Sequence, residues 1–200
     1  STLVSIIGDK PGLGYKTFAV NDSNYVFLGD DRRVRADMKL LAADGTGVQL
    51  LTNNDNTDVL QDITLTLNRF SLEKIFDVLP YTPDLSGTLN GDFHIIQTKT
   101  ELSISSAVSI TDMVYQQCAM GDLSTEFVYM PKTDGSHYID GMLMHNDYEV
   151  GRLSGTYYSK GGGTLDATFS MDRLPMFLAN GFIPKRVIGF KGYGEGELTI

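Results

Sequence analysis

The sequence predicts a mainly β fold built from short strands joined by turns. Apolar and polar residues alternate along many segments, which is the period-two pattern of a strand with one buried and one exposed face. Clusters of Gly, Asn and Asp separate these segments, as at residues 44–47, 53–57 and 132–136. A meander, a sandwich and an open solenoid are all consistent with this pattern.

The clearest strands lie in the first half of the chain. Residues 33–40 alternate between charged and apolar side chains, and residues 62–67 alternate between polar and apolar side chains. Residues 85–95 contain Asn90-Gly91, a dipeptide typical of a two-residue hairpin turn. The odd-numbered residues of this segment nevertheless form an unbroken row, so we predict one long strand there. The same alternation predicts further strands within residues 102–104, 123–129, 153–157 and 167–171.

Two segments depart from this pattern toward a helix. Apolar residues of segment 71–79 are spaced i, i+3, i+4 and i+7, as on one face of a helix, and Pro80 ends it. Pro175 is suited to the first turn of a second, shorter helix over residues 175–180. We therefore expect at most two short helices.

Residues 63–95 and 167–200 resemble each other. In each part an alternating strand ends in Asn/Asp-Arg-apolar, and a short helix, a proline and a glycine-containing strand follow. Arg69 and Arg173 are 104 positions apart, as are Pro80 and Pro184. Because this spacing is constant across charged and apolar positions, we predict an internal duplication.

The charge balance argues against one class of partner. Asp and Glu total 25 against 16 Lys and Arg, which gives a formal net charge of -9. An acidic chain is repelled by nucleic acid, so we expect no nucleic-acid partner. No apolar run approaches the roughly 18 residues of a membrane-spanning helix. The chain starts at Ser1 and ends on a strand-like pattern, so we expect residues 1–200 to be a single β-rich fragment of a longer protein.

No motif indicates catalysis or a cofactor. His137, Asp140, His145 and Asp147 form the best candidate metal cluster, but their spacing matches no known ligand pattern. We therefore predict a protein that is not an enzyme, with no catalytic residue, metal or cofactor. A carbohydrate-active sandwich is an alternative that would require two close carboxylates of different pKa.

The duplicated pattern resembles the TamB family of large envelope proteins, within the AsmA-like superfamily of diderm bacteria. The resemblance rests on the Asn/Asp-Arg-apolar strand ends and on residues 85–93, whose sequence is LSGTLNGDF. Residues 180–184 (NGFIP) and 192–198 (GYGEGEL) are most similar to the C-terminal part of Bacteroidetes members. The resemblance covers about residues 20–200.

The resemblance implies a parent protein that is anchored in the inner membrane by an N-terminal helix and crosses the periplasm. Such a protein forms a long curled antiparallel sheet, open like a solenoid and taco-shaped, whose concave face is an apolar groove. The family is linked to outer-membrane assembly with an Omp85-type barrel, and to phospholipid transport between the two membranes. We therefore expect a periplasmic segment of such a protein, with the barrel binding parts of the parent chain outside residues 1–200.

Ten apolar residues of the two copies are predicted to line this groove and contact phospholipid or another apolar chain. They share one side of their strands: Ile63, Leu65, Leu67, Leu85, Leu89, Phe93, Phe169, Met171, Leu198 and Ile200. An apolar strand face is more often core than groove, so both interpretations stay open. An alternative function is β-augmentation, in which an exposed sheet edge binds an extended protein client of a translocation or secretion system.

Overall fold

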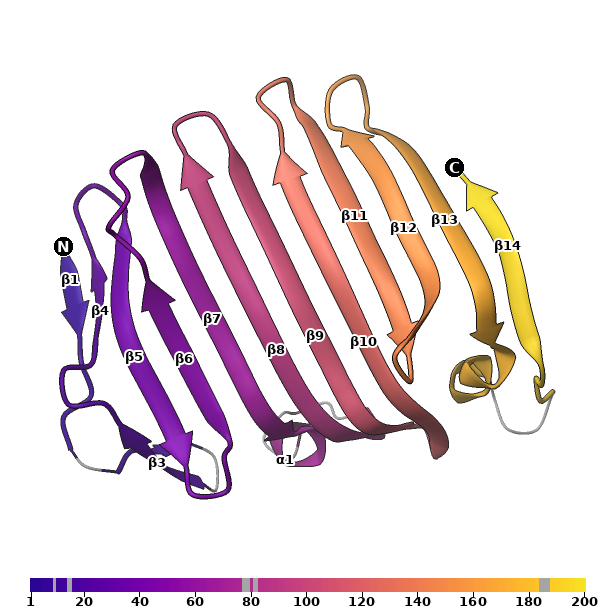
Figure 1. Ribbon diagram of the computed structural model, residues 1–200, viewed down its shortest axis with the longest axis horizontal. Helices are drawn as coiled ribbons and strands as arrows, with labels where there is room; N and C mark the ends of the chain where they lie inside the picture. Colours follow the sequence, from indigo (N-terminus) through magenta and orange to yellow (C-terminus); the bar gives the residue numbers. More distant parts are fainter. Residues whose placement is uncertain (9, 14–15, 77–79, 81–82, 184–187) are drawn as a thin grey trace.

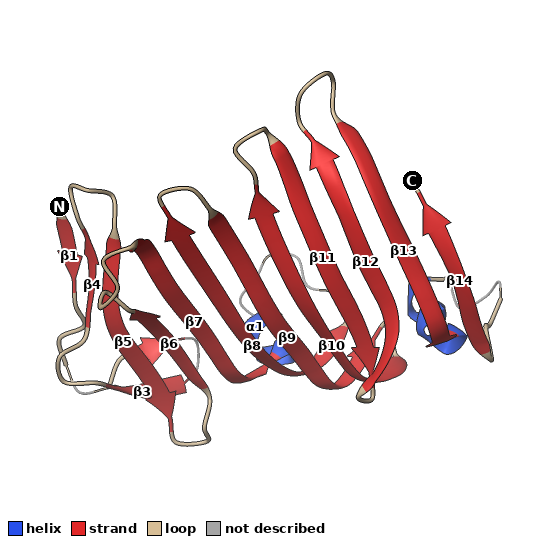
Figure 2. Ribbon diagram, turned by 45° about the horizontal axis from the view of Figure 1, so that its top comes forward, coloured by secondary structure: helices blue, strands red, loops and turns tan. Residues whose placement is uncertain are grey.

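The computed structural model describes residues 1–8, 10–13, 16–76, 80, 83–183 and 188–200. These residues form a mainly β structure, as predicted: one long antiparallel meander with two short helices (Figures 1 and 2). Within this part of the chain, no helix is long and apolar enough to cross a membrane.

The elements follow one another along the chain with short connections. The strands are β1 (Thr2–Val4), β2 (Gly12–Leu13), β3 (Lys16–Val20), β4 (Tyr25–Leu28), β5 (Val34–Ala42), β6 (Gly47–Thr52), β7 (Val59–Ser71), β8 (Leu85–Thr98), β9 (Leu102–Tyr115), β10 (Cys118–Pro131), β11 (Ser136–His145), β12 (Tyr148–Tyr158), β13 (Thr164–Pro175) and β14 (Tyr193–Thr199). The helices are α1 (Leu72–Phe76) and the 3₁₀-helix η1 (Met176–Phe182). The segment with Asn90-Gly91 lies inside β8, which confirms the prediction of one long strand.

Strand order follows chain order across most of the sheet. From β4 to β14 each strand pairs in antiparallel fashion with the next strand along the chain. Helix α1 lies in the connection between β7 and β8, and η1 lies in the connection between β13 and β14. β1 pairs with β4, and β3 pairs with the end of β5 that β4 leaves free. The two chain termini therefore lie at opposite sides of the sheet (Figure 1).

The sheet is neither closed nor strongly curled, so the predicted taco-shaped curl is wrong for this chain. Bending of a sheet comes from β-bulges and irregular registers. From β7 to β13 most register shifts lie toward one end of the strands, at positions such as Leu67/Phe70, Ser86/Thr88 and Met171/Leu174. The middle of each strand keeps an unbroken register, so the centre of the sheet extends sideways without folding over itself.

Both helices pack at the end of the sheet where these shifts lie. Leu72 of α1 is buried, and α1 contacts β7 and β8. Phe177 of η1 meets the His145 ring edge-on at 5.8 Å between centroids. Gly181 lies so close to β10 that an added Cβ would be 2.5 Å from the Met120 Cε. The second helix is thus a 3₁₀-helix that runs to Phe182, two residues past the predicted end, while residues 77–79 and Pro184 lie outside the described residues.

The two similar parts of the sequence have matching strand registers. The register shift at Leu67/Phe70 in β7 corresponds to the shift at Met171/Leu174 in β13, 104 positions later. Arg69 and Arg173 sit inside these shifts with positive φ of 54° and 50°. Each strand then leads into a short helix and returns as a partner strand, β8 or β14.

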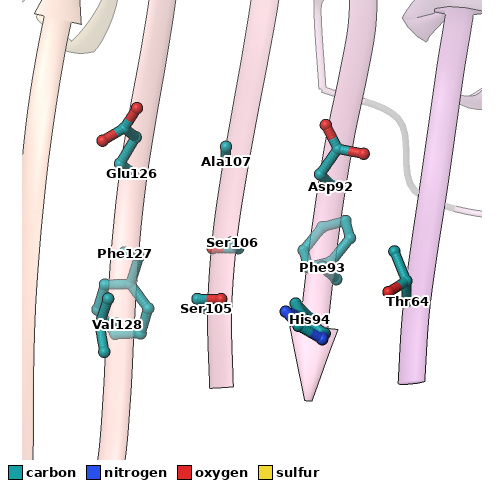
Figure 3. A pocket seen from close by; sticks show the side chains of 10 residues that line it. All are labelled: Thr64, Asp92, Phe93, His94, Ser105, Ser106, Ala107, Glu126, Phe127 and Val128. Atoms are coloured by element: carbon teal, nitrogen blue, oxygen red, sulfur yellow. The ribbon is translucent and has the colours of Figure 1, made fainter. Parts of the chain in front are cut away.

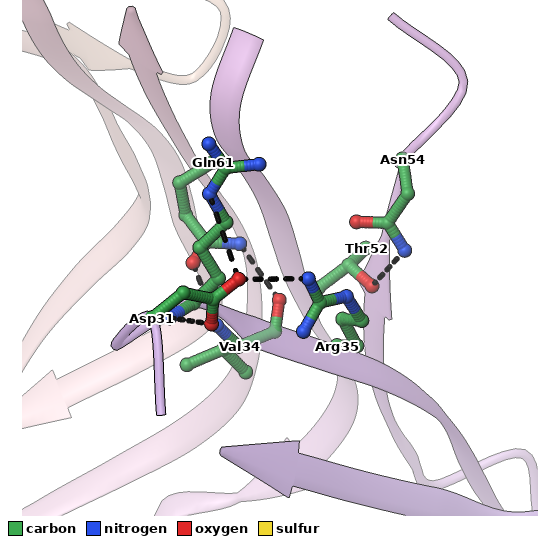
Figure 4. Close-up of polar contacts among 7 residues, drawn as sticks. Asp31, Val34, Arg35, Thr52, Asn54 and Gln61 are labelled. Atoms are coloured by element: carbon green, nitrogen blue, oxygen red, sulfur yellow. Dashed lines mark hydrogen bonds and ion pairs between the residues drawn. The ribbon is translucent and has the colours of Figure 1, made fainter. Parts of the chain in front are cut away.

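Two side chains take the place of backbone partners where β6 is shorter than β5 (Figure 4). The Gln61 side chain donates to the Val34 carbonyl and accepts from the Val34 N–H, both at 2.8 Å. The Thr52 hydroxyl accepts from the Ala36 N–H at 2.9 Å and donates to the Ala36 carbonyl at 3.3 Å. These contacts satisfy backbone groups of β5 that would otherwise have no partner in the ladder.

Candidate functional site

The candidate site is one face of the sheet, which we call the apolar face and define as the side carrying Ile63, Leu65 and Leu67 of β7. Side chains of residues directly paired across antiparallel strands share a face, so the registers transfer this side from strand to strand. Three rows result, each crossing the sheet from β7 to β14. They are Ile63–Ile95–Ile104–Tyr129–Ile139–Gly155–Ala167–Ile200, Leu65–Phe93–Ser106–Phe127–Gly141–Leu153–Phe169–Leu198 and Leu67–Gly91–Val108–Thr125–Leu143–Gly151–Met171–Gly196.

These three rows contain no Asp, Glu, Lys or Arg. The second and third rows continue without a charge into β6 through Leu50 and Val48, and into β5 through Met38 and Leu40. Most of the large side chains in the rows are half-buried by their neighbours rather than fully covered. The apolar face is therefore a broad surface without charge, and its side chains cover one another only partly.

The structure brings nearly all of the predicted site residues together on this face. Ile63, Leu65, Leu67, Phe93, Phe169, Met171, Leu198 and Ile200 belong to the three rows. Leu89 lies in the adjacent row, between Phe70 and Ile110. Leu85 lies beyond the register shift at Ser86/Thr88, opposite Tyr115 near the irregular end of the sheet.

Three phenylalanines of the middle row lie over glycines. A Cβ added at Gly91 would be 3.1 Å from the Phe93 ring, and one added at Gly141 would be 3.3 Å from the Phe127 ring. At Gly151 the nearest atom would be Cζ of Phe169, at 3.5 Å. Rings packed over glycine in this way lie low against the backbone. The glycines thus keep the apolar face shallow at these three points.

The opposite side of the strands, which we call the polar face, carries the charges. One row on it contains Lys39, Asp92, Glu126, Arg152 and Glu197, in register between the second and third apolar rows. Nearby, the Tyr138 hydroxyl donates to Asp140 at 3.0 Å, and this contact raises the pKa of Tyr138. Glu149, which accepts from Arg152 at 2.8 Å, raises the pKa of the guanidinium group.

A hollow of about 460 Å³ lies on the polar face over β9 (Figure 3). β9 presents small side chains there, Ser105 and Ala107, and Asp92 and Glu126 are the direct neighbours of Ala107 on the two adjacent strands. Asp92 accepts a hydrogen bond from the Thr66 hydroxyl at 3.0 Å. The carboxylates stand on strands separated by one strand, about 10 Å apart at the backbone. Its lining also includes His94, Phe93, Phe127 and Val128, so the two carboxylates border a hollow whose surface is largely apolar.

The four residues considered as a metal cluster do not converge. His137 lies on the apolar face, where its Nδ1 is hydrogen-bonded to the Tyr129 hydroxyl at 2.7 Å, whereas Asp140 lies on the polar face. His145 is buried and its Nε2 donates to the Met120 carbonyl at 2.9 Å. Among the described residues, no group of three or more metal-ligating side chains could hold an ion.

The predicted site residues all lie in the two duplicated parts, and they include neither Ile95 of the first part nor any residue of the strands between the two parts. Ile95 and Phe127 occupy central positions of the apolar face, as do residues of β9, β11 and β12 such as Val108, Leu143 and Leu153. The signal that could have identified them is the same period-two alternation, since these residues are in phase with the alternating segments of the sequence.

One edge of the sheet is open at β14. Within the part of the chain that the structure describes, β14 pairs only with β13. Leu198 and Ile200 are 56% and 67% exposed. Within residues 1–200, the apolar face therefore extends as far as β14.

Comparison with known proteins found no matching family model, no matching curated protein and no matching solved structure.

Proposed function

We propose that this chain is a non-enzymatic periplasmic segment of a TamB-like, envelope-spanning protein, and that its apolar face binds phospholipid acyl chains during transport between the membranes. The observation that carries the proposal is the charge-free apolar face, which runs from β5 to β14. The parent protein would be anchored in the inner membrane and support outer-membrane assembly with an Omp85-type barrel. Support for this wider role comes from the sequence resemblance alone.

An acyl chain needs apolar area rather than specific polar partners. Each buried methylene group contributes about 0.8 kcal/mol, so contact along several strands can hold a chain without any charged contact. The three rows supply such contact in a direction that crosses the strands. On an open sheet the bound chain replaces water on one side only, which suits transient binding and onward movement.

The test is to place a charge on the apolar face and to measure bound lipid. In the variants L89D and F169D, we expect less fluorescent phosphatidylcholine to co-elute with the protein in gel filtration, because a carboxylate is costly to bury against an acyl chain. Lipid binding by the unchanged protein should depend little on salt concentration, because no ion pair contributes to it.

Matched controls are available on the same two strands. The variants N90D and T168D add the same charge to the polar face one residue away, and we expect them to bind lipid normally. Circular dichroism and urea unfolding separate the possible outcomes. Unfolding of L89D and F169D would show that the face is a core, and unchanged lipid binding by folded variants would refute the proposal.

A second candidate function is binding of an extended protein client by β-augmentation. The observation that bears on it is that the backbone groups on the outer side of β14 are not used by β13. This function needs the edge rather than the apolar face, so a substitution at the edge would separate it from lipid binding.

A further inference from the structure

Three ring-bearing side chains lie together at one margin of the apolar face, and we call them the aromatic rim. They are Tyr129 of β10, His137 of β11 and Tyr157 of β12. The His137 ring stacks on Tyr129 at 5.9 Å between centroids and meets Tyr157 at 5.8 Å. The hairpin turns that follow β10 and β12 adjoin the rim and lie at the end of the sheet opposite the helices (Figure 1).

The rim presents two polar groups that have no hydrogen-bond partner among the described residues. They are Nε2 of His137 and the hydroxyl of Tyr157. The Tyr129 hydroxyl lies 2.7 Å from Nδ1 of His137. When this hydroxyl donates to Nδ1, the neutral form of the ring carries its proton on Nε2 and donates from there to a ligand. The rim therefore offers two uncharged donors, one N–H and one O–H.

The Tyr157 hydroxyl lies beside the glycine-rich turn between β12 and β13. A Cβ added at Gly163 would be 2.7 Å from the hydroxyl oxygen. Gly163 has a φ of 79°, which glycine adopts without the steric cost that other residues meet. Tyr157 itself is 40% exposed. The absence of a side chain at Gly163 thus leaves the hydroxyl accessible to a ligand.

The other end of β11 has no comparable free donor. His145 lies on the same side of the strand eight residues after His137, a distance of about 26 Å along a strand. It is buried, its Nε2 donates to the Met120 carbonyl, and Phe177 of η1 meets its ring edge-on. No charged side chain lies on the apolar face between the two histidines of β11. An uncharged surface therefore runs from an open polar end to an end that a helix covers.

Charges of both signs lie on the turns beside the rim. Hydrogen bonds from Ser136 lower the pKa of Asp134, and Lys160 acts in the same direction. Lys132 and Lys160 form no ion pair with any residue that the structure describes. Two cations and one anion of this kind suit a head group that itself carries charges of both signs.

We propose that the aromatic rim binds the phosphate group of a zwitterionic phospholipid whose acyl chains lie on the apolar face. His137 Nε2–H and Tyr157 O–H would donate to phosphate oxygens. The rings would lie at the boundary between chains and head group, where amphipathic aromatic side chains are favoured. Because these two donors are uncharged, the contact needs no ion pair. The inference rests on the acyl-chain proposal above and names the polar part of the ligand.

Two lipids with the same short acyl chains test the proposal. Dihexanoyl phosphatidylcholine, used below its micelle concentration, carries the phosphate, and dihexanoylglycerol lacks it. Isothermal titration calorimetry of the whole 200-residue chain gives the affinity for each lipid. We expect phosphatidylcholine to bind about tenfold more tightly, because only this lipid forms the two additional hydrogen bonds.

Variants of the rim assign this preference to its two donors. The double variant H137F/Y157F keeps the rings and removes both donors, so the ratio of the two affinities should fall to about one. Y158F is the matched control, because Tyr158 is the next residue, lies on the polar face and is 47% exposed. We expect Y158F to keep the tenfold preference. Urea unfolding verifies that the variants are folded, and Y157F alone should lower the ratio about threefold if the double variant is not.

Nuclear magnetic resonance locates the phosphate independently of affinity. The imidazole signals of His137 are identified by their loss in H137F. They should shift more on addition of phosphatidylcholine than on addition of dihexanoylglycerol, because only the phosphate accepts from Nε2. Equal shifts with the two lipids would contradict the contact.

Equal affinity of the unchanged protein for the two lipids would overturn the rim proposal, as would a preference that survives in folded H137F/Y157F. Displacement of phosphatidylcholine by an equal concentration of inorganic phosphate would show a site for the free anion and would also overturn it. If L89D weakens both lipids while their affinities are equal, the acyl-chain proposal stands and the rim proposal fails. If folded L89D and F169D bind both lipids normally, the acyl-chain proposal itself fails.

Discussion

At the scale of single residues, side chains complete a backbone ladder where strands differ in length. Gln61 of β7 supplies both a donor and an acceptor to Val34 of β5. The variant Q61M keeps the length and apolar stem of the side chain and removes both hydrogen-bonding groups. We expect the free energy of unfolding to fall by about 1–2 kcal/mol, because two partly buried backbone groups lose their partner. Urea unfolding measures this change, provided that the m-value stays constant.

The variant Q97M is a matched control for Gln61. Gln97 pairs with Gln61 in the β7–β8 ladder and is exposed. We expect its replacement to change the free energy of unfolding by less than about 0.5 kcal/mol, as for other surface positions. An equal effect of the two substitutions would contradict the role assigned to the Gln61 amide.

At the scale of elements, the strands β7 and β13 of the two copies leave the extended backbone conformation at equivalent residues. Arg69 and Arg173 have φ of 54° and 50°, a region that β-branched residues rarely adopt. We expect R69V and R173V each to lower the free energy of unfolding by about 1–2 kcal/mol, and R69G and R173G to be better tolerated. Urea unfolding of the four variants measures this. If valine were tolerated as well as glycine at either position, the left-handed conformation would not be a requirement of the unit.

Alternation in the sequence predicts the strands and their faces, but it does not predict the register shifts at residues such as Arg69 and Arg173. Alternation predicted β8 as one strand despite Asn90-Gly91, and it assigned Leu65, Phe93 and Phe169 to one side of their strands, where the structure places them in one row. The curl was wrong because the shape of a sheet depends on where its register shifts lie. Arginine has no preference for positive φ, so residue type does not reveal these shifts at Arg69 and Arg173. The face of Leu85 depends on such a shift, and alternation alone does not determine it.

At the scale of the whole molecule, the chain exposes more surface than a compact protein of its size. Its accessible surface is 12998 Å² at a mass of 22.0 kDa. A compact monomer of that mass is expected to expose about 9,300 Å². The difference follows from the arrangement of the strands, because a sheet whose strands lie beside one another leaves both faces accessible to solvent. One of these faces carries no charge in its three central rows, so the open arrangement leaves an uncharged surface accessible to solvent.

We therefore expect the native monomer to bind the dye 8-anilinonaphthalene-1-sulfonate strongly while it keeps its near-ultraviolet circular dichroism and unfolds cooperatively. Molten globules also bind this dye, but they lose the near-ultraviolet signal, so the combination identifies an ordered apolar surface. A short-chain phosphatidylcholine below its micelle concentration should reduce the dye fluorescence, because both ligands need the same face.

F127D, which places a charge in the middle row, should weaken dye binding, and the polar-face control E126Q should not. Light scattering verifies that the protein is monomeric at the concentration used. If the native monomer gave no more dye fluorescence than a compact protein, the apolar face would be inaccessible to the dye. Binding of acyl chains on this face would then be ruled out as well.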